Sequence, residues 1–457
     1  MNIRPILILI VFFVWHAGVL AQQTDSRVQQ TGSAAPRRMN LQEAVDLALK
    51  HNHIVRIASL HVEEEQHAKD VARSAYLPIL RNDTSFTHVT DTQFIEIAAG
   101  SLGTVGTNAI PPRDHIINQG GKDIFASVTG VTQPLTELLK IKAKNDAARA
   151  EIEASRGKSK EVENDVELKV RQLYYRILVT QSQQHAIEAK IRAVEDLQGE
   201  RVQQVKYGST LEADLIEARA QSLEAKQQLL TTQLQLSDLR MQFNDVLGIP
   251  IKTDIALDAN IPPPPDSCER ELCIKLALDS QPEITQARAM VEKAEAGVRE
   301  AKREYIPDVE AFAHYAHQND NVPFLAPNFG TFGVHVGYDL FDGGKKKATL
   351  RERDSQLAQA KENLARISDE VELRVQTAYN KLERTEQMVA VSQELLAARR
   401  EARRVSAQQL ERGAYLRSQA DAAKAQEFEA ETVLLQSQLD YAQAHDELTQ
   451  AIGIMTH

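Results

Sequence analysis

Aromatic residues and cysteines are scarce in this chain of 457 residues. Phe, Trp and Tyr together make up 5% of it, Trp15 is the single tryptophan, and there are 2 cysteines. Ala, Gln, Glu, Leu, Lys and Arg are abundant instead, a composition typical of long helices and coiled coils rather than of a thick globular core. The formal net charge of −11 argues against nucleic acid as a partner.

Long apolar runs are also missing after residue 21. No later window reaches the roughly eighteen uninterrupted apolar residues of a membrane-spanning helix, so a membrane form of the mature chain must span as strands. The alternative is a soluble periplasmic or secreted protein. Residues 1–21 have the pattern of a cleaved secretory signal, with Arg4, an apolar core and small residues before the cleavage site; a short N-terminal membrane anchor is the alternative. Residues 22–38 predict a flexible lead.

One stretch combines two kinds of structure. From Thr331 to Leu340 the side chains alternate, which predicts a strand with one apolar and one small or polar face. The polar run that starts at Lys345 then predicts a very long helix. No segment is evident that would cover the apolar face, so we interpret the junction as a barrel wall joined to a tunnel. The apolar set is Phe332, Val334, Val336, Tyr338 and Leu340, and the opposite set is Thr331, Gly333, His335, Gly337 and Asp339.

The first half of the chain predicts a regular order of elements. Asn40 and Glu43 form a capping box that begins a helix extending to about residue 74, and Pro78 precedes a strand over 79–89. A loop over 90–121 and a second strand over 124–135 follow. Helices are then predicted over 137–208 and 211–247, with Gly208 in the turn between them.

The second half repeats this plan, which is the strongest internal evidence for the architecture. Tyr305-Ile306-Pro307 matches Tyr76-Leu77-Pro78 at a shift of 229 residues, and from the strand end onward the shift is 205, as for Gly208 and Gly413. The difference of 24 residues falls in the loop between the strands. We therefore divide the chain into a first repeat (39–250), a Pro-rich linker (251–268) and a second repeat (269–457).

The predicted fold is mainly α with a small β part. A tandem helix-strand-strand-helix-helix repeat supplies four strands per chain, too few to close a barrel, and open edges are not tolerated in lipid. Three chains would pool twelve strands, within the range of outer-membrane barrels, and their long helices would form an α-helical tunnel. A soluble coiled-coil rod with small β caps is the alternative.

The sequence resembles the TolC-type outer-membrane efflux protein family over essentially the whole mature chain. The resemblance rests on an ordered, duplicated set of motifs rather than on any one of them. They are Leu41-Gln42-Glu43-Ala44, the two Tyr-x-Pro motifs, Gln133-Pro134-Leu135 and Leu340-Phe341-Asp342-Gly343-Gly344 at the strand–helix junctions, the turn glycines Gly208 and Gly413, and Leu247-Gly248.

This resemblance implies a homotrimer with a 12-stranded barrel in the outer membrane and an α-barrel across the periplasm. It also implies a periplasmic adaptor (membrane fusion) protein and an inner-membrane pump of RND or ABC type as partners. The expected function is passive conduction of substrates from that pump to the outside, gated at the periplasmic helix tips. Two alternatives stay open: an outlet for type I protein secretion and a periplasmic coiled-coil protein without a pore.

Acidic residues follow the first predicted tip. Asp214 and Glu217 share a helical face, with Glu212 beside them, and three copies would make acidic rings that attract cations; an ordinary solvated helix face is the alternative. The second tip departs from the family pattern, with Gln419 and Ala422 at the matching positions and Asp421 nearby. Arg412 and Arg417 make it partly basic, and we hypothesise that they form salt bridges to Glu212 or Asp214 that hold the tip closed.

The sequence offers few other residues with a chemical role. Cys268 and Cys273 beside the Pro-rich linker are either a local disulfide or two free thiols. The sequence shows no phosphate-binding loop, metal-ligand cluster or nucleophile elbow. We therefore predict no enzymatic activity, no cofactor and no metal site.

Overall fold

The computed structural model describes residues 37–455 except 92–93, 119–120, 263, 266 and 320–325. The predicted signal segment (1–21) and all but the last two residues of the predicted lead (22–38) lie outside the described residues. Those last two residues, Arg37 and Arg38, belong to a short strand.

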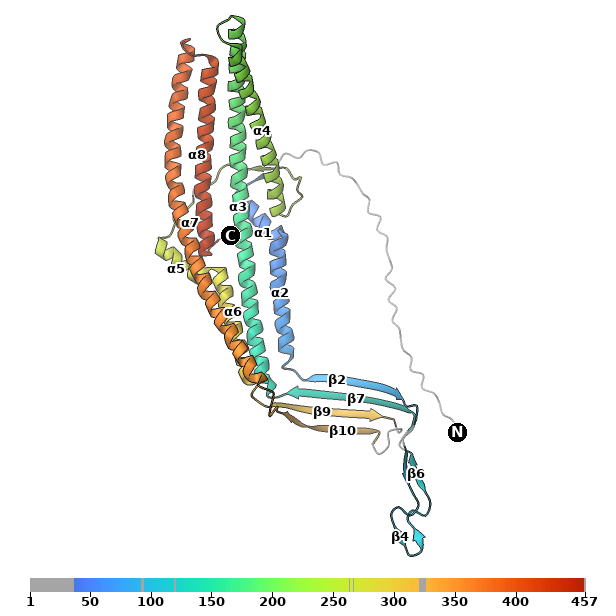
Figure 1. Ribbon diagram of the computed structural model, residues 1–457. Helices are drawn as coiled ribbons and strands as arrows, with labels where there is room; N and C mark the ends of the chain where they lie inside the picture. Colours follow the sequence, from blue (N-terminus) through green and yellow to red (C-terminus); the bar gives the residue numbers. More distant parts are fainter. Residues whose placement is uncertain are drawn as a thin grey trace.

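The chain is mainly helical, and the predicted helix-strand-strand-helix-helix order is present twice (Figure 1). The main elements of the first repeat are β1 (Arg37–Met39), α1 (Leu41–His51), α2 (His53–Ser74), β2 (Ile79–His88), β7 (Asp123–Pro134), α3 (Glu137–Lys206) and α4 (Glu212–Val246). Those of the linker and the second repeat are β8 (Ile255–Leu257), α5 (Arg270–Ser280), α6 (Pro282–Arg303), β9 (Asp308–Gln318), β10 (Asn328–Gly337), α7 (Lys345–Glu411) and α8 (Arg417–Ile452).

Two long helices determine the shape of the molecule. Helix α3 has 70 residues and α7 has 67, so each is about 100 Å long. The returning helices α4 and α8 lie along the half of α3 and α7 remote from the strands, while α2 and α6 lie along the other half (Figure 1). No helix in the described part of the chain is long and apolar enough to cross a membrane.

The buried core is concentrated where these helices overlap, near the middle of their length. One cluster joins α1, α3 and α4 through residues such as Val45, Tyr174 and Phe243, and a second joins α5, α7 and α8 through residues such as Cys273 and Val375. Tyr174 also donates to the backbone oxygens of Met39 (3.1 Å) and Asp258 (2.7 Å). It thereby ties the parallel pair β1–β8 to the long helix α3.

The single helix predicted from residue 40 to 74 is wrong in one respect, because it is interrupted at Asn52. The backbone of Asn52 is extended (φ −65°, ψ 129°), and its side-chain oxygen accepts from the Ile54 N–H at 2.8 Å. Its side-chain nitrogen donates to the Val246 carbonyl at 2.8 Å. The break between α1 and α2 is therefore stabilised by a contact with the end of α4, which is remote in sequence.

The predicted loop over 90–121 contains further strands, so that prediction was wrong in part. Strands β3 (Phe94–Ile97) and β6 (His115–Asn118) pair with each other, as do β4 (Thr104–Val105) and β5 (Asn108–Ala109). They form a narrow extension beyond the end of the main sheet that is remote from the helices (Figure 1).

The four principal strands form one antiparallel sheet in the order β10-β9-β7-β2. Its central pair, β7–β9, joins the two repeats, so each repeat contributes half of a continuous sheet. The outer edges of β2 and β10 have no partner strand within the described residues.

The Asn52 break is expected to stabilise the fold more than the cap at Asn40 does. Asn52→Ala removes a helix cap together with the bond to Val246, whereas Asn40→Ala removes only an exposed capping box. Caps contribute about 1 kcal/mol and a buried acceptor left without a partner costs a further 1–3 kcal/mol. The free energy of unfolding should fall by about 2–4 kcal/mol in Asn52→Ala and by about 1 kcal/mol in Asn40→Ala. It is measured by circular dichroism during guanidinium unfolding in detergent. Equal losses in the two variants would contradict the prediction.

Candidate functional site

The register of the main sheet separates its side chains into two different faces. Directly paired residues of antiparallel strands project from the same side, which allows each face to be followed across all four strands. The apolar face is formed by Leu80, Phe86, Phe125, Val131, Val309, Ala311, Ala313, Tyr315, Phe332, Val334 and Val336.

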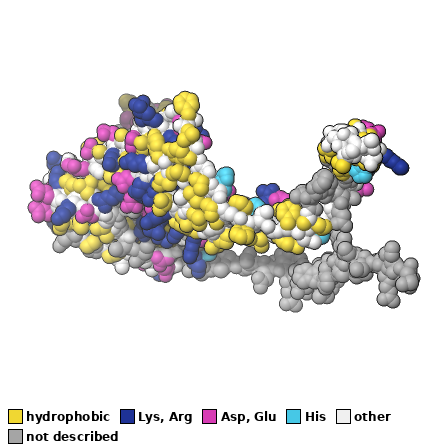
Figure 2. All heavy atoms as spheres, turned by 90° about the horizontal axis from the view of Figure 1, so that it is seen from below, with side chains coloured by type: hydrophobic (Ala, Val, Ile, Leu, Met, Phe, Trp, Pro, Cys, Tyr) yellow, Lys and Arg dark blue, Asp and Glu magenta, His cyan; other side chains and the backbone are white. Residues whose placement is uncertain are grey.

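This apolar face is open to its surroundings. Phe332 is 88% exposed, and Leu80, Phe86 and Val336 are also exposed. The ionisable side chains that share the face, His88, Asp123 and His317, all lie at the end of the sheet remote from the helices. In Figure 2, charged side chains are dense over the helical part and sparse along the sheet. Such a face is suited to contact with lipid hydrocarbon, since exposed apolar patches of this size are unusual in water.

Four of the polar side chains on the apolar face lie together on β2 and β7, and they satisfy one another. The Asn82 amide donates to Ser127 (3.1 Å) and Thr129 (2.8 Å), while Thr84 bonds to Asn82 (2.8 Å) and Ser127 (3.0 Å). An unsatisfied polar group in hydrocarbon costs several kcal/mol. This closed arrangement therefore makes the polar side chains compatible with an apolar medium.

The opposite face is polar. It carries the charged and ionisable side chains of the sheet's interior, including an Arg81–Asp83 ion pair at 2.9 Å. The alternation predicted for 331–340 is thus part of a sidedness that extends across four strands. The polar residues of this face are Arg81, Asp83, Ser85, Thr87, Thr132, Glu310, His314, Gln318, Thr331 and His335, and the apolar Ile79, Ile124, Val128, Phe312 and Phe329 lie among them.

The junction between β7 and α3 is bonded to the junction between α6 and β9 in the other repeat. At the end of β7, just after Pro134, Thr136 donates its hydroxyl proton to the Pro307 carbonyl (2.8 Å) and accepts from the Val309 N–H (2.7 Å). Leu135 N–H donates to the Val309 carbonyl at 2.8 Å. The two junctions therefore act as one rigid corner.

The Asp342-Gly343-Gly344 junction begins α7. Both glycines have positive φ (67° and 87°), a conformation that favours glycine. The Asp342 carboxylate accepts from the N–H groups of Lys346 and Gly344, each at 2.9 Å. These backbone hydrogen bonds, that from Lys346 first, hold the pKa of Asp342 below its usual range. Asp342 thus has a structural role in starting the helix.

The predicted turn glycines are at the tips of both helix pairs, remote from the sheet. Gly208 and Gly413 have φ values of 70° and 73°. In the first tip, the Asp214 carboxylate accepts from the Thr210 hydroxyl (2.5 Å) and the Leu211 N–H (3.3 Å). These bonds, the Thr210 hydroxyl first, lower the pKa of Asp214.

Gln419 is the residue of the second tip that is equivalent to Asp214. It also accepts a hydrogen bond at the start of its helix, but through a neutral amide. Gln419 accepts from the Leu416 N–H at 3.0 Å, as Asp214 does from Leu211. The departure at Gln419 therefore preserves the helix start while removing a negative charge. Of the other predicted acids, Glu212 is exposed and Glu217 accepts from Gln221 at 3.1 Å.

The structure shows ion pairs at the second tip other than the ones we hypothesised. Arg417 lies 3.5 Å from Asp196 of α3 and 3.6 Å from Asp421 of its own helix, rather than near Glu212 or Asp214. A hydrogen bond with the Asp421 carboxyl raises the pKa of Asp196, with Arg417 opposing that rise. No ion pair connects Arg412 to any described residue. The hypothesis is thus wrong within one chain.

Two residues of α3 that sequence reasoning missed complete this contact. Asp196 pairs with Arg417, and Glu200 accepts from the backbone N–H of Ser418 at 2.9 Å and from its hydroxyl. Glu200 therefore caps the first turn of α8 from the neighbouring long helix. No local sequence pattern identifies either residue, because their role depends on the position of α3 along its axis relative to α8.

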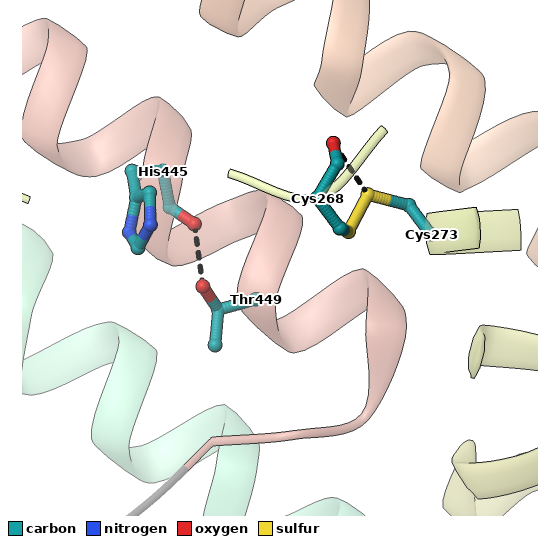
Figure 3. Close-up of a disulfide and its surroundings, with 4 residues drawn as sticks. All are labelled: Cys268, Cys273, His445 and Thr449. Atoms are coloured by element: carbon teal, nitrogen blue, oxygen red, sulfur yellow. Dashed lines mark hydrogen bonds between the residues drawn. A yellow bond between two sulfur atoms is a disulfide. The ribbon is translucent and has the colours of Figure 1, made fainter. Parts of the chain in front are cut away.

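The two cysteines form a disulfide at the start of α5 (Figure 3). Cys273 is fully buried in the core cluster of α5, α7 and α8, and the bridge anchors the end of the linker there. The same region of α8 contributes His445 and Thr449, whose hydroxyl donates to the His445 carbonyl at 2.9 Å. Within the described ranges, His, Cys, Asp and Glu side chains form no group of three suited to a metal.

A buried polar cluster between α3 and α8 was also missed. Arg171 donates to Glu167 (2.7 Å) and to Asp446 (3.5 Å), and Tyr175 donates its hydroxyl proton to Asp446 at 2.8 Å. Burial raises the pKa of Asp446 to about 6, and Arg171 limits the rise. Because a carboxylate this deep depends on its partners, the cluster defines the register between the two helices.

Solved structures of proteins described as outer-membrane proteins or channels share this architecture. CmeC of Campylobacter jejuni superposes with a TM-score of 0.74 at 13% identity, covering 90% of this chain and 85% of CmeC. VceC of Vibrio cholerae gives 0.70 at 16% identity, with 90% and 96% covered. MtrE of Neisseria gonorrhoeae gives 0.70 at 17%, with 90% and 88% covered. At these identities the likeness establishes the fold.

The sequence of the second repeat matches a family model. Residues 273–454 match the family model described as outer membrane efflux protein. Together with the shared fold, this match confirms the resemblance to the TolC-type outer-membrane efflux protein family. No curated protein matches the sequence.

Asp446 is expected to make stability depend on pH. Its pKa is higher in the folded chain than the ordinary 3.8, so the folded state binds the proton more tightly and this contribution to stability is lost as pH rises from about 4 through about 6. The difference corresponds to roughly 3 kcal/mol. Relative to Asp446→Asn, the wild type should lose about that much unfolding free energy over this range in guanidinium titrations.

Asp440→Asn is the matched control for this measurement, because Asp440 lies on the same helix and is partly exposed. It should keep the wild-type dependence on pH. Identical profiles for the wild type and Asp446→Asn would contradict the assignment.

Proposed function

We propose that this protein is the outer-membrane channel of an efflux system and conducts substrates passively from the periplasm to the outside. One observation carries the proposal: a sheet with a charge-free apolar band on one face and a polar opposite face continues directly into helices about 100 Å long. That combination fits a wall with lipid outside and water inside, extended by a tunnel.

The two free edges of the sheet favour assembly from several copies. Backbone groups on the outer edges of β2 and β10 need partners in lipid, and β10 of one copy is positioned to pair with β2 of the next. Two copies would give eight strands, an interior that side chains fill. Three would give twelve strands and leave a lumen, which agrees with the homotrimer implied by the family resemblance.

The proposed partners are those that the family resemblance implies, and the length of the helices agrees with them. A tunnel about 100 Å long reaches far into the periplasm, where a periplasmic adaptor protein and an inner-membrane pump would connect to its tips. The solved structures that share the fold include proteins described as outer membrane channels. This likeness supports the proposal without identifying the substrate or the class of pump.

We place the gate at the helix tips. The links of Arg417 to Asp196 and of Ser418 to Glu200 hold the start of α8 against α3. Opening requires the tip of the α7–α8 pair to move relative to α3, so these links would have to loosen. The acids Glu212 and Glu217 would face the entrance if the α4 tips converge, and Asp214 would add charge while capping its helix.

Native mass and conductance test the proposed function together. Membranes that hold the exported protein are separated by density, and the protein is extracted in mild detergent. An outer-membrane particle of about three chains that carries current across planar bilayers is expected. A soluble monomer or dimer would contradict the proposal and favour the coiled-coil rod.

Charge reversal at Arg417 is expected to open the tip. Arg417→Glu places a third carboxylate beside Asp196 and Asp421 and replaces attraction by repulsion. Leak of large antibiotics through the outer membrane should rise severalfold, measured as sensitivity in cells that lack the pump. The matched control is Arg404→Glu on α7, because Arg404 pairs only within its own helix, with Glu401. Equal leak in the two variants would contradict this gate.

A further inference from the structure

The charge of the long helices differs between their two ends. The ends of α2, α3, α6 and α7 meet the sheet (Figure 1). The seven residues of each that lie nearest the sheet together contain 11 Lys or Arg and 3 Asp or Glu, in a chain with 53 Lys or Arg and 64 Asp or Glu. At the tips, the last seven residues of α3 and α7 and the first seven of α4 and α8 contain 3 Lys or Arg and 6 Asp or Glu. We call the four helix ends beside the sheet the basic collar.

The start of α7 has the highest positive charge in the basic collar. Lys345, Lys346 and Lys347 occupy its first turn, which contains no acid. Lysine in a first turn is unfavourable, because the N-terminal end of the helix dipole is positive. The Asp342 carboxylate already accepts from the backbone N–H groups of Gly344 and Lys346, so the helix start has its cap. The three lysines therefore do not stabilise α7 electrostatically, and their role lies outside the helix.

The lysines at the start of α7 have no acidic partner in the described part of the chain. Lys140, which matches Lys345 in the first repeat, pairs with Asp308 at 2.5 Å, whereas none of the three lysines of α7 forms such a pair. The adjoining segments contain fewer acids than are needed to cancel the charge of the basic collar. These acids are Glu304, Asp308, Asp339 and Asp342.

The lysines follow directly on the apolar face of the sheet. Tyr338 continues the alternation of Val336 and the apolar side chains before it, and the Lys346 ammonium lies 4.7 Å from the centroid of the Tyr338 ring. Between them, Leu340 and Phe341 are 93% and 89% exposed. Tyrosine is enriched at membrane–water interfaces, and lysine can lay its apolar stem on hydrocarbon while its charge reaches the headgroups. The order apolar, aromatic, cationic along the chain is that of a membrane boundary.

The next copy in the proposed assembly would add positive charge beside these lysines. If β10 pairs with β2 of the next copy, the end of that copy's α2, just before β2, lies beside the start of α7. The last two turns of α2 contain Lys69 and Arg73, with Asp70 as their single acid. Neither Lys69 nor Arg73 has an ion pair within the described ranges. The neighbouring copy therefore extends the basic collar and does not neutralise it.

We infer that the basic collar binds anionic phospholipids in the leaflet of the outer membrane that faces the periplasm, with Lys345, Lys346 and Lys347 at its centre. The inference rests on the proposed channel, which places the apolar face in lipid. Basic segments beside a membrane attract anionic headgroups, and the attraction falls off within a Debye length. Leu340 and Phe341 favour a lipid over a soluble anion, because the acyl chains of a lipid would cover them while its phosphate meets the lysines.

The test is the retention of lipid by the purified full-length protein in mild detergent. The immobilised protein is incubated with equal amounts of phosphatidylglycerol and phosphatidylcholine that have the same acyl chains, then washed, and the retained lipids are quantified by mass spectrometry. The wild type should retain severalfold more phosphatidylglycerol, and washing at high salt should reduce this preference. The triple variant Lys345→Gln/Lys346→Gln/Lys347→Gln should lose most of the preference.

Two controls separate the position of the charge from its amount. Replacing the same three lysines by arginine keeps the charge and should keep the preference. The variant Lys206→Gln/Arg219→Gln/Lys424→Gln removes three positive charges near the helix tips, from exposed side chains without an ion pair in the described part of the chain, and should also keep the preference. An equal loss in this tip variant and in the α7 variant would show that only overall charge matters, and would overturn the inference.

The outcomes also separate this inference from the proposed function. Native mass and conductance are measured on the same samples, and the α7 glutamine variant should assemble and conduct as the wild type does. A conducting trimer that retains both lipids equally, or a glutamine variant that keeps the full preference, would overturn the inference and leave the channel intact. A wild type that forms no outer-membrane particle would overturn the channel itself, and the inference with it.

Discussion

Unpaired backbone groups on the two outer strands are the constraint on which this architecture depends. Within the described sheet, β2 and β10 each bond on one side only, and the face beside these edges is apolar and exposed. Backbone groups in an apolar medium must all be satisfied. In the proposed channel, a single chain is therefore one part of a closed wall, and the long helices share an axis once the edges of several copies meet.

The tandem duplication also aligns the strands of the two repeats within one sheet. Because β7 of the first repeat pairs with β9 of the second, the contact between the repeats determines the register of the whole sheet. Thr136 and Leu135 bond to the start of β9 at the same place. The direction of α3 is therefore coupled to the direction of the strands.

Much of the fold follows from local patterns. Alternation over ten residues predicts β10, the Asn40–Glu43 capping box predicts the start of α1, and the glycines at 208 and 413 predict the tips, because each signal depends on neighbours in the chain. Asn52 is different: an asparagine in a helical pattern is ambiguous until the Val246 carbonyl provides a partner. The paired strands within 90–121 were missed because segments of two to four residues carry little periodicity.

The candidate site was less predictable for the same reason. The acids that follow Gly208 are visible in the sequence, but Asp196 and Glu200 acquire their role from the axial position of α3 beside α8. The exchange of Asp214 for Gln419 likewise looked like the loss of a functional acid. In three dimensions both residues accept from the backbone at the start of a returning helix, and only the charge differs.

The extension formed by β3 to β6 has a consequence for how this protein can vary. It is paired internally, while the ten residue pairs between β2 and β7 establish the main register independently of it. Length and sequence there can therefore change without altering the wall. In the proposed channel this extension lies at the outer end of the barrel, where such a segment would be free to diverge rapidly and would be a suitable place to insert a foreign peptide for display.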